Sequence, residues 1–546
     1  MHKFSLKNVS SLEKVMPSTT LSAAEYNGAS CLCGERFSYQ IAVIANVEDA
    51  GPAVRADIRV CSDLDVKIYD VVSVPVSMPA FANEYDNDFI TRESAVIPDL
   101  LTSNDGTMAV SSYFYKALWL TVDVDRNAAS GEHKITVCFE KDGEMLGESV
   151  FRLNVIGAEL PKQKLIFTQW FHCDCISSYY GLEPLSEEHW SYMERFAKAA
   201  AESGVNMLLT PIFTPPLDTK IGAERPTVQL IDVIYEDGVY GFDFTKLTRW
   251  LDMCRRCDIE YIEISHLFSQ WGAMCAPKIV VYENGSEIKK FGWHTDSLSE
   301  EYKDFLSQLL PKLTEYLSEN WDKEKVYFHI SDEPNQDYIE RYGVIQEFLK
   351  PFIDGFHHMD AISDYELYEK GFIETPVPTI RTIDSFIGSG IENLWAYYCC
   401  GEGKYNLSNR FIAMPSCRNR IIGAQLYKYD IKGFLQWGYN FYYSQLSTRL
   451  VNPYVINDAD SGFPAGDAFS VYPGADGPDP SLRLFVFYDA LQDMRAMQLL
   501  ESICGRDAVT ELIDSEGEID FRTYPRSAEY ILNLRERINK MIAENI

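Results

Sequence analysis

The sequence has no long hydrophobic run. No segment of its 546 residues approaches the roughly 18 uninterrupted apolar residues that a membrane span requires. The first twenty residues, MHKFSLKNVSSLEKVMPSTT, also contain no continuous apolar stretch of the kind that a secretory signal has. We therefore expect a cytoplasmic protein that has no membrane partner.

Basic residues are scarce relative to acidic ones. The chain contains 49 Lys and Arg against 81 Asp and Glu, which gives a formal net charge of −32. Such a charge repels nucleic acid and anionic membrane surfaces, so nucleic acid is not an expected partner. No GxGxxG or P-loop pattern follows the first predicted strand of the α/β region, which disfavours nucleotide binding. We predict no cofactor.

The thirteen cysteines are odd in number and show no regular spacing. A chain of this size does not need disulfides to stabilise its core, so reduced cysteines are expected. Cys254 and Cys257 form a C-x-x-C in a predicted helix without a second pair nearby. The run from His172 to Cys175 likewise lacks a converging set of ligands. We interpret these residues as packing cysteines and predict no metal.

The most informative segment covers residues 326–334, Val-Tyr-Phe-His-Ile-Ser-Asp-Glu-Pro. A run of apolar, β-branched and aromatic residues ends at Asp332 and Glu333, and Pro334 stops a regular strand from continuing. Parallel α/β folds place their chemistry at the carboxyl ends of strands, and paired carboxyls there are typical of glycoside hydrolysis. A solvated turn with a helix cap is the alternative interpretation of this segment.

Residues 1–157 are predicted to form an N-terminal β-sandwich domain. From about Ser38 to Val155, short segments rich in β-branched and aromatic residues alternate with turn formers such as Asn127-Ala-Ala-Ser-Gly. Residues 157–162, which include Pro161, form the predicted linker. Together with the region that follows, this indicates an all-β domain followed by an α/β domain.

Residues 162–505 show strand and helix patterns in alternation, about eight units in all, which predicts a (β/α)8 TIM-like catalytic barrel. In this count Asp332 and Glu333 end the fourth strand. Residues 506–546 are predicted to be a C-terminal helical extension packed on the barrel. The strands are expected at 165–171, 205–210, 259–265, 325–331, 359–363, 376–383, 393–398 and 433–439, and helices at 187–203, 244–258, 299–320, 337–353 and 409–429.

A barrel gathers its strand ends at one face, so polar and aromatic residues that close other strands are expected near the two carboxyls. Any one Trp at a strand end is more often explained by core or loop packing, but four strands that end in Trp favour a sugar-binding cleft. The candidate substrate-binding residues are Gln169, Trp170, His172, His266, Trp271, Trp293, Trp395, Tyr397, Tyr398, Trp437, Tyr439 and Asp467.

The adjacency of Asp332 and Glu333 also limits the mechanism. A usual retaining glycosidase holds two carboxyls roughly 5 Å apart, from different elements, across the scissile bond. Neighbours on one strand end cannot easily flank a sugar in that way. One can reach the leaving oxygen while the other reaches an adjacent ring substituent, which suits attack by the substrate's own 2-acetamido carbonyl.

Several motifs in order resemble glycoside hydrolase family 123. They are Ser265-His-Leu-Phe-Ser-Gln-Trp-Gly, Ala276-Pro-Lys-Ile, Phe291-Gly-Trp-His-Thr, His329-Ile-Ser-Asp-Glu-Pro, Gly433-Phe-Leu-Gln-Trp-Gly-Tyr-Asn, Asp467, Tyr472-Pro-Gly and Ser481-Leu-Arg. The resemblance covers roughly residues 160–505, and in that family a β-sandwich precedes the catalytic barrel. It implies an exo-acting, retaining β-N-acetylgalactosaminidase that uses substrate assistance and takes oligosaccharides with terminal β-linked N-acetylgalactosamine.

By motif, Asp332 resembles the residue that orients the acetamido group, and Glu333 resembles the general acid/base. Asp467 is either a ligand of sugar hydroxyls or a solvated loop acid, and Arg483 either orients that carboxylate or pairs on the surface. Two functional alternatives stay open. The enzyme could act on N-acetylglucosamine by the same mechanism, or the chain could be a non-catalytic carbohydrate-binding protein.

Overall fold

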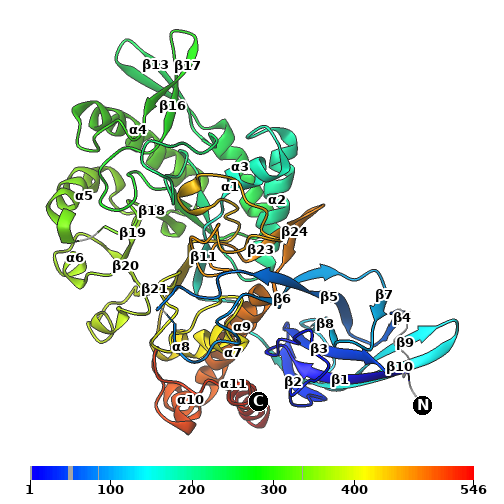
Figure 1. The fold of residues 1–546 in the computed structure, drawn as a ribbon. Coiled ribbons are helices and arrows are strands. Elements are labelled where there is room, and N and C mark those ends of the chain that lie inside the picture. The colour runs from blue at the N-terminus through cyan, green and yellow to red at the C-terminus, as the bar shows by residue number, and fades with distance from the viewer. Residues whose placement is uncertain (1–2, 47–52, 84, 335) are drawn as a thin grey trace.

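The computed structural model describes residues 3–46, 53–83, 85–334 and 336–546. Its N-terminal part packs two five-stranded sheets face to face, drawn in blue and cyan at the lower right of Figure 1. The sheets have the spatial orders β1-β3-β8-β5-β6 and β2-β10-β9-β4-β7, and only β2 and β10 pair in parallel. The strands are β1 (Phe4–Ser10), β2 (Gly28–Cys33), β3 (Arg36–Ala45), β4 (Val54–Cys61), β5 (Asp65–Val76), β6 (Ala95–Ser103), β7 (Thr107–Val110), β8 (Lys116–Asp123), β9 (Gly131–Lys141) and β10 (Glu144–Glu159).

Alternating side chains hold the two sheets together. Tyr39 and Ile41 on β3 point inward with Phe151 on β10, and all three are fully buried. The rings of Tyr39 and Phe151 stack across the sandwich with centroids 4.2 Å apart. The strands begin at Phe4, well before the predicted start near Ser38, because all of β1 pairs with the part of β3 from Tyr39 to Ala45. Strand β10 also runs through the first half of the predicted linker and ends at Glu159.

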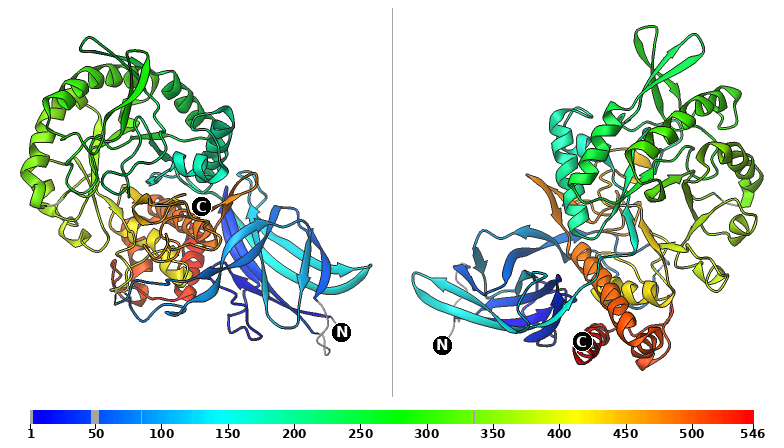
Figure 2. Two further views of the ribbon diagram at one scale, coloured as in Figure 1. Left: turned by 45° about the horizontal axis from the view of Figure 1, so that its top comes forward. Right: turned by 180° about the vertical axis from the view of Figure 1, so that it is seen from behind.

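The following part is a nearly closed barrel of eight parallel strands, seen along its opening in the left view of Figure 2. The strand order is β20-β19-β18-β15-β12-β11-β22-β21, and a single bridge between Thr379 and Tyr397 joins the two ends. As predicted, the strand that precedes Asp332 is the fourth in chain order. The strands are β11 (Ile166–Gln169), β12 (Met207–Thr210), β15 (Tyr261–Ile264), β18 (Val326–His329), β19 (His357–Ile362), β20 (Thr375–Pro378), β21 (Trp395–Tyr397) and β22 (Gly433–Gln436).

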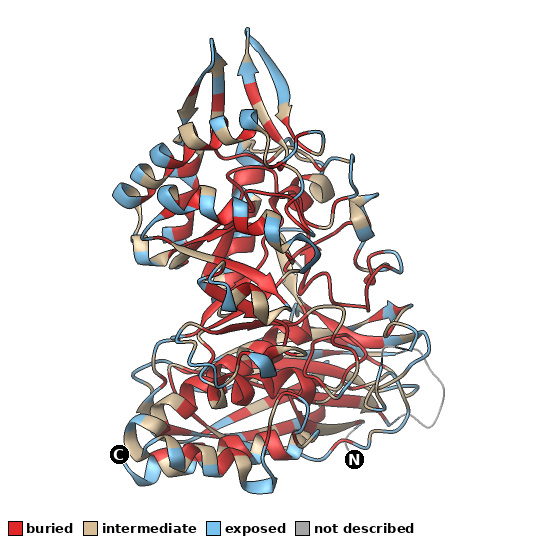
Figure 3. Cartoon of the chain, turned by 90° about the vertical axis from the view of Figure 1, so that its left-hand side faces the viewer, coloured by how far each residue is buried: buried red, intermediate tan, exposed pale blue. Residues whose placement is uncertain are grey.

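Helices surround most of the barrel, and Figure 3 shows the buried strands inside them. The pattern is not a full (β/α)8 repeat, since the described residues between β20 and β21 form only the short η3 (Ile383–Ser385). The helices are α1 (Cys173–Tyr180), α2 (Glu187–Glu202), α3 (Thr245–Arg256), α4 (Glu300–Asn320), α5 (Ile339–Ile353), α6 (Tyr365–Glu369), α7 (Ser416–Arg420), α8 (Ile422–Lys428), α9 (Leu482–Cys504), α10 (Arg506–Ile513) and α11 (Ala528–Glu544).

The predicted helix at 409–429 is wrong in its first part, because helix α7 starts only at Ser416. Pro415 occupies its N-cap position. Before it, the side chain of Asn409 donates to the carbonyl of Cys399, and the guanidinium of Arg410 is buried against the barrel. These contacts hold residues 409–415 in an irregular course that a helix could not follow.

Two hairpins extend from the loops that follow β12 and β15. They are β13 (Asp232–Glu236) with β14 (Val239–Asp243), and β16 (Ile279–Glu283) with β17 (Ser286–Phe291). A third hairpin, β23 (Val471–Gly474) with β24 (Gly477–Pro480), precedes α9. Among the described residues, none of the helices combines the length and apolar character needed to cross a bilayer.

The sandwich and the barrel meet at a buried ion pair. Arg483 on α9 donates to both carboxylate oxygens of Asp99 on β6, at 2.8 and 3.0 Å, and the hydroxyl of Tyr472 donates to the same carboxylate at 2.7 Å. Arg483 also donates to the carbonyls of Gly466 and Phe469. It therefore neither contacts the side chain of Asp467 nor pairs on the surface, the two roles that the sequence suggested.

We expect Arg483→Met to lower the free energy of unfolding by about 3–5 kcal/mol, because Asp99 would stay buried without its cation. Urea unfolding followed by tryptophan fluorescence measures this loss. Arg249→Met is a matched control, since Arg249 makes an equally good two-point pair with Glu187 but in an exposed position. That control should cost at most about 1 kcal/mol. Equal losses in the two variants would contradict the importance of burial.

Candidate active site

The two carboxyls lie where β18 leaves the barrel. All four residues of β18 are buried, and Asp332 follows three positions after its last residue. The backbone of Asp332 is held from the loop after β15, since the amide of Trp271 donates to its carbonyl at 2.8 Å. Glu333 has a φ of +48°, in the left-handed region that side-chain-bearing residues rarely adopt. Such backbone strain typically costs about 1–3 kcal/mol and clusters at functional sites.

The charge of Glu333 influences the protonation of Asp332. Burial and the neighbouring charge of Glu333 raise the pKa of Asp332 well above its ordinary value, while the charge of His329 opposes this rise. The free site therefore favours the protonated form of Asp332.

Tyr397 supplies a direct partner for Glu333. It ends β21, on the far side of the barrel from the Trp271 loop, and its hydroxyl donates to Oε1 of Glu333 at 2.7 Å. Burial raises the pKa of Tyr397 well above its ordinary value, so the phenol stays neutral and can donate. This places one predicted aromatic residue in contact with the carboxylate pair.

A second acidic group lies beyond β22. The indole of Trp437 donates to Oδ2 of Asp467 at 2.8 Å, and Oδ1 of this fully buried residue has no partner among the described atoms. Burial raises the pKa of Asp467 to about 7. The amide of Gln436 fixes the backbone by donating to the carbonyl of Asp467. Trp437 and Asp467 thus form a unit with one unused carboxyl oxygen.

Glu402 is a third acidic group at this face, and sequence reasoning missed it. It lies in the turn after β21, where the amide of Cys399 donates to Oε2 at 2.8 Å and Arg381 lies 3.8 Å from Oε1. Burial and the charge of Glu333 raise the pKa of Glu402 to about 7, and the charge of Glu402 in turn contributes to the raised pKa of Asp467. Tyr397 ends a barrel strand, and Glu402 follows it by five residues. This closeness to a strand end is the one sequence signal that could have indicated Glu402.

Trp170 and His266 form a buried floor. The Trp170 ring lies 5.1 Å from that of His266, and its indole donates to Oε1 of Glu263 at 2.8 Å. The His266 ring lies 4.0 Å from that of His329. Trp170 and His266 are almost inaccessible, so they support the site from below.

Gln169 and His172 position other residues of the site. Oε1 of Gln169 accepts from Arg410 and from Ser470. Burial lowers the pKa of His172 to about 3, so its ring is neutral. Its Nδ1 lies 3.2 Å from the guanidinium of Arg225, and its Nε2 lies 2.9 Å from the carbonyl of Trp437. His172 therefore fixes the backbone that carries Trp437.

Three predicted substrate-binding residues are fully or almost fully buried and pack against the protein interior. Trp395 starts β21, so its ring lies deep in the barrel beside Tyr327, with centroids 5.4 Å apart. Tyr398 follows the alternation of the strand outward and packs on Phe434. The hydroxyl of Tyr439 donates to the carbonyl of Phe196 on α2. Their binding roles therefore stay predictions, and each ring has a packing partner in this structure.

Trp271 and Trp293 differ in accessibility. Trp271 is 44% exposed and has a left-handed φ of +55°, directly beside the backbone of Asp332. Trp293 is half-buried, and its indole donates to the carbonyl of Ala223. Trp271 thus offers an open aromatic surface next to the carboxyls, whereas Trp293 braces the neighbouring loops.

A metal-binding role is not supported for the run after β11. Arg225 donates to both carboxylate oxygens of Asp174 at 2.7 Å, which occupies that carboxylate. Among the described residues, no group of three or more His, Cys, Asp and Glu side chains is arranged to bind a metal ion.

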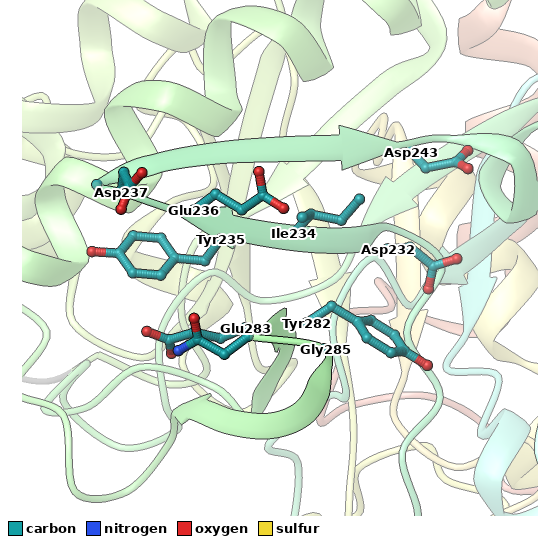
Figure 4. A pocket seen from close by; sticks show the side chains of 11 residues that line it. Asp232, Ile234, Tyr235, Glu236, Asp237, Asp243, Tyr282, Glu283 and Gly285 are labelled. Carbon is teal, nitrogen blue, oxygen red and sulfur yellow. The ribbon is translucent and has the colours of Figure 1, made fainter.

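A groove of about 770 Å³ lies between the two projecting hairpins, as Figure 4 shows. Strands β13 and β16 pair at only two positions, Ile234 with Tyr282 and Tyr235 with Glu283, so the hairpin tips diverge. No residue that contacts Asp332 or Glu333 lines this groove. It is distinct from the carboxylate site.

Comparisons with known proteins agree with this geometry. Residues 170–500 match the model of the glycoside hydrolase 123 catalytic domain. A family 123 glycoside hydrolase from Clostridium perfringens, studied for glycolipid glycan hydrolysis, aligns with a TM-score of 0.73 and 14% identity, over 99% of this chain and 98% of that one. No curated protein matches the sequence.

Two further solved structures are much less similar. A family 5 mannosidase from Rhizomucor miehei has a TM-score of 0.33 and 12% identity, covering 61% of this chain and 94% of that one. A family 5 xyloglucanase from Bacteroides ovatus has a TM-score of 0.32 and 9% identity, covering 89% and 100%. Similarity at these scores carries no argument, so the fold assignment depends on the Clostridium perfringens structure.

Proposed function

The chain belongs to glycoside hydrolase family 123, and from this premise we propose that it removes terminal β-linked N-acetylgalactosamine by a retaining, substrate-assisted mechanism. The observation that carries the proposal is the adjacency of Asp332 and Glu333 at the end of one strand, with Tyr397 donating to Glu333. Two carboxyls placed in this way cannot lie on opposite faces of one sugar ring.

In the proposed first step, the carbonyl oxygen of the 2-acetamido group attacks the anomeric carbon, and the glycosidic bond breaks. Glu333 gives its proton to the leaving oxygen, and Asp332 accepts a hydrogen bond from the acetamido N–H. Water then attacks the anomeric carbon of the cyclic oxazoline-type intermediate and gives its proton to Glu333, while the bond from that carbon to the acetamido oxygen breaks and the acetamido group is restored. Two inversions at that carbon leave the product with the original β configuration.

Substrate binding also changes the protonation of Asp332. In the free site, burial and the charge of Glu333 favour the protonated form of Asp332. An acetamido N–H that donates to Asp332 favours the ionised form of that carboxyl. A sugar with the correct substituent therefore stabilises the form of Asp332 that the mechanism uses.

The same face offers groups for the sugar hydroxyls. The exposed ring of Trp271 is the best placed for stacking on a sugar, and the unpartnered Oδ1 of the buried Asp467 can accept from a hydroxyl that enters this face. The Clostridium perfringens enzyme acts on glycolipid glycans, and we propose glycans of this kind, with an exposed terminal N-acetylgalactosamine, as natural substrates.

The test is hydrolysis of three aryl glycosides, the β-N-acetylgalactosaminide, the β-N-acetylglucosaminide and the plain β-galactoside. We expect rapid turnover of the first only, with release of the β-anomer observed by NMR, and strong inhibition by the matching thiazoline. Preference for the second would change the sugar but keep the mechanism. Comparable turnover of the plain galactoside would contradict substrate assistance, and inactivity on all acetamido sugars would contradict the proposed function.

Tyr397→Phe should move the alkaline limb of the kcat/KM profile to higher pH by about one unit. The reason is that loss of a hydrogen bond to the carboxylate form of Glu333 favours its protonated form, and a general acid is active when protonated. Tyr439→Phe is the matched control, since its hydroxyl binds the backbone of α2. An unchanged alkaline limb in Tyr397→Phe would show that this hydrogen bond does not tune the acid.

A further inference from the structure

His329, the last residue of β18, lies fully buried between two carboxylates. Its Nδ1 is 2.9 Å from Oε1 of Glu263 on β15, and its Nε2 is 3.5 Å from Oδ1 of Asp360 on β19. All three side chains are inaccessible to solvent. A buried carboxylate needs a compensating charge, and here one ring faces two of them.

Hydrogen-bond donors surround both carboxylates. Glu263 also accepts from the indole of Trp170 and from the hydroxyl of Thr168, each at 2.8 Å. Asp360 accepts from the amide of Ser331 at 2.8 Å and from the hydroxyl of Tyr342. These donors use carboxylate lone pairs, and the ring of His329 faces both carboxylates. The charge of His358 also acts on Asp360.

Protonation of His329 follows from this arrangement. Burial works against a charged ring, but the hydrogen bond to Glu263 and the charges of Asp360 and Asp332 outweigh it and raise the pKa of His329. His266, the other titratable group packed on the ring, is different. Burial and the charge of His329 hold its pKa well below the ordinary value, so it stays neutral. Burial alone raises the pKa of Asp360 to about 6, which still leaves it ionised at neutral pH.

We propose that His329 is a positioning residue, a buried imidazolium fixed by Glu263 and Asp360 that keeps Asp332 available as a carboxylate for the acetamido N–H. The inference rests on the proposed function. Burial and Glu333 both drive Asp332 toward its protonated form, and the imidazolium acts in the opposite direction. Without this charge, Asp332 would hold its proton too firmly to accept from the substrate.

The first measurement is independent of activity. Histidine ring nitrogens and carbons of the full chain, labelled selectively, are followed by NMR from pH 5 to pH 9, with the His329→Gln and His266→Gln spectra giving the assignments. We expect the His329 ring to stay doubly protonated at pH 7 and above, and the His266 ring to be neutral throughout. A His329 ring that is neutral at pH 7 would overturn the proposal.

The second measurement is the pH profile of kcat/KM for the aryl N-acetylgalactosaminide. In His329→Gln the acidic limb should move to higher pH by about one unit, because Asp332 loses a nearby opposite charge and keeps its proton to higher pH. Glu263→Gln retains the ring but removes its strongest partner, so it should shift the limb in the same direction even if His329→Gln does not fold. His294→Gln, at an exposed position, should leave the profile unchanged.

These results separate the two proposals. Wild-type activity with unshifted acidic limbs in the folded variants would reject the role of His329 and leave the proposed function intact. Wild-type inactivity on every acetamido sugar would reject the proposed function, while the NMR titration would still decide whether the ring is charged.

Discussion

Glu333→Gln is expected to reduce kcat/KM for β-N-acetylgalactosaminyl oligosaccharides by about 100- to 10,000-fold, the usual contribution of a general acid. The loss should be far smaller for an aryl glycoside with a good leaving group, because its departure needs no proton. Since kcat/KM reports the first irreversible step, the comparison isolates acid catalysis from the later hydrolysis of the intermediate.

A control variant at another glutamate shows whether loss of a negative charge alone lowers activity. Glu340→Gln, at an exposed position early in α5, should leave both substrates unaffected. Equal losses on the oligosaccharide and the aryl glycoside in Glu333→Gln would argue against the acid role, and would point instead to a role in binding. The double variant Tyr397→Phe with Glu333→Gln should add little to the single one if Tyr397 acts only through Glu333.

Asp332→Asn should lower kcat for acetamido sugars by about 100- to 1,000-fold, the scale seen when one preorganised electrostatic contact at the reacting centre is removed. An asparagine can still meet the N–H through its carbonyl, but it carries no charge to stabilise the cationic intermediate. Affinity for the thiazoline should fall in parallel, since this inhibitor resembles that intermediate. Calorimetric titration and steady-state kinetics measure the two effects.

The pH profile of kcat/KM is a second test of Asp332→Asn. Because the pKa of Asp332 is raised, the acidic limb of the wild-type profile should lie above the range of an ordinary carboxyl, and Asp332→Asn should abolish it. Asp354→Asn, at an exposed position after α5, is the control. Persistence of the acidic limb in Asp332→Asn would assign it to another group, with Asp467 and Glu402 as the next candidates.

The position of the carboxylate pair could be predicted because it follows from local pattern. An apolar run that ends at Asp332 can be read as a strand end without knowing its neighbours, and the repeated strand and helix patterns place that end in a barrel. Tyr397 and Trp395 show where this reasoning stops. Both side chains point into the barrel from β21, where they are two residues apart. Tyr397 ends this short strand and lies at the reactive face, whereas Trp395 begins it and lies deeper in the barrel.

Residues outside the strands were harder to predict for another reason. Glu402 lies in a turn, and its role depends on the amide of Cys399 and on burial, neither of which sequence spacing reveals. The partner of Arg483 is Asp99, which is 384 residues away in the chain. Long-range ion pairs of this kind have no local signature, so the sequence could suggest only short-range partners for Arg483.

The contacts of Arg483 also bear on how this enzyme can be shortened or recombined. A fragment that began at the barrel would lack Asp99, and the guanidinium that grips the carbonyls of Gly466 and Phe469 would be left without its counterion. The loop that presents Asp467 would lose its anchor at the same time. The sandwich thus stabilises the loop that carries Asp467. A chimera that joins the barrel to another N-terminal domain would need an acidic residue at the place of Asp99.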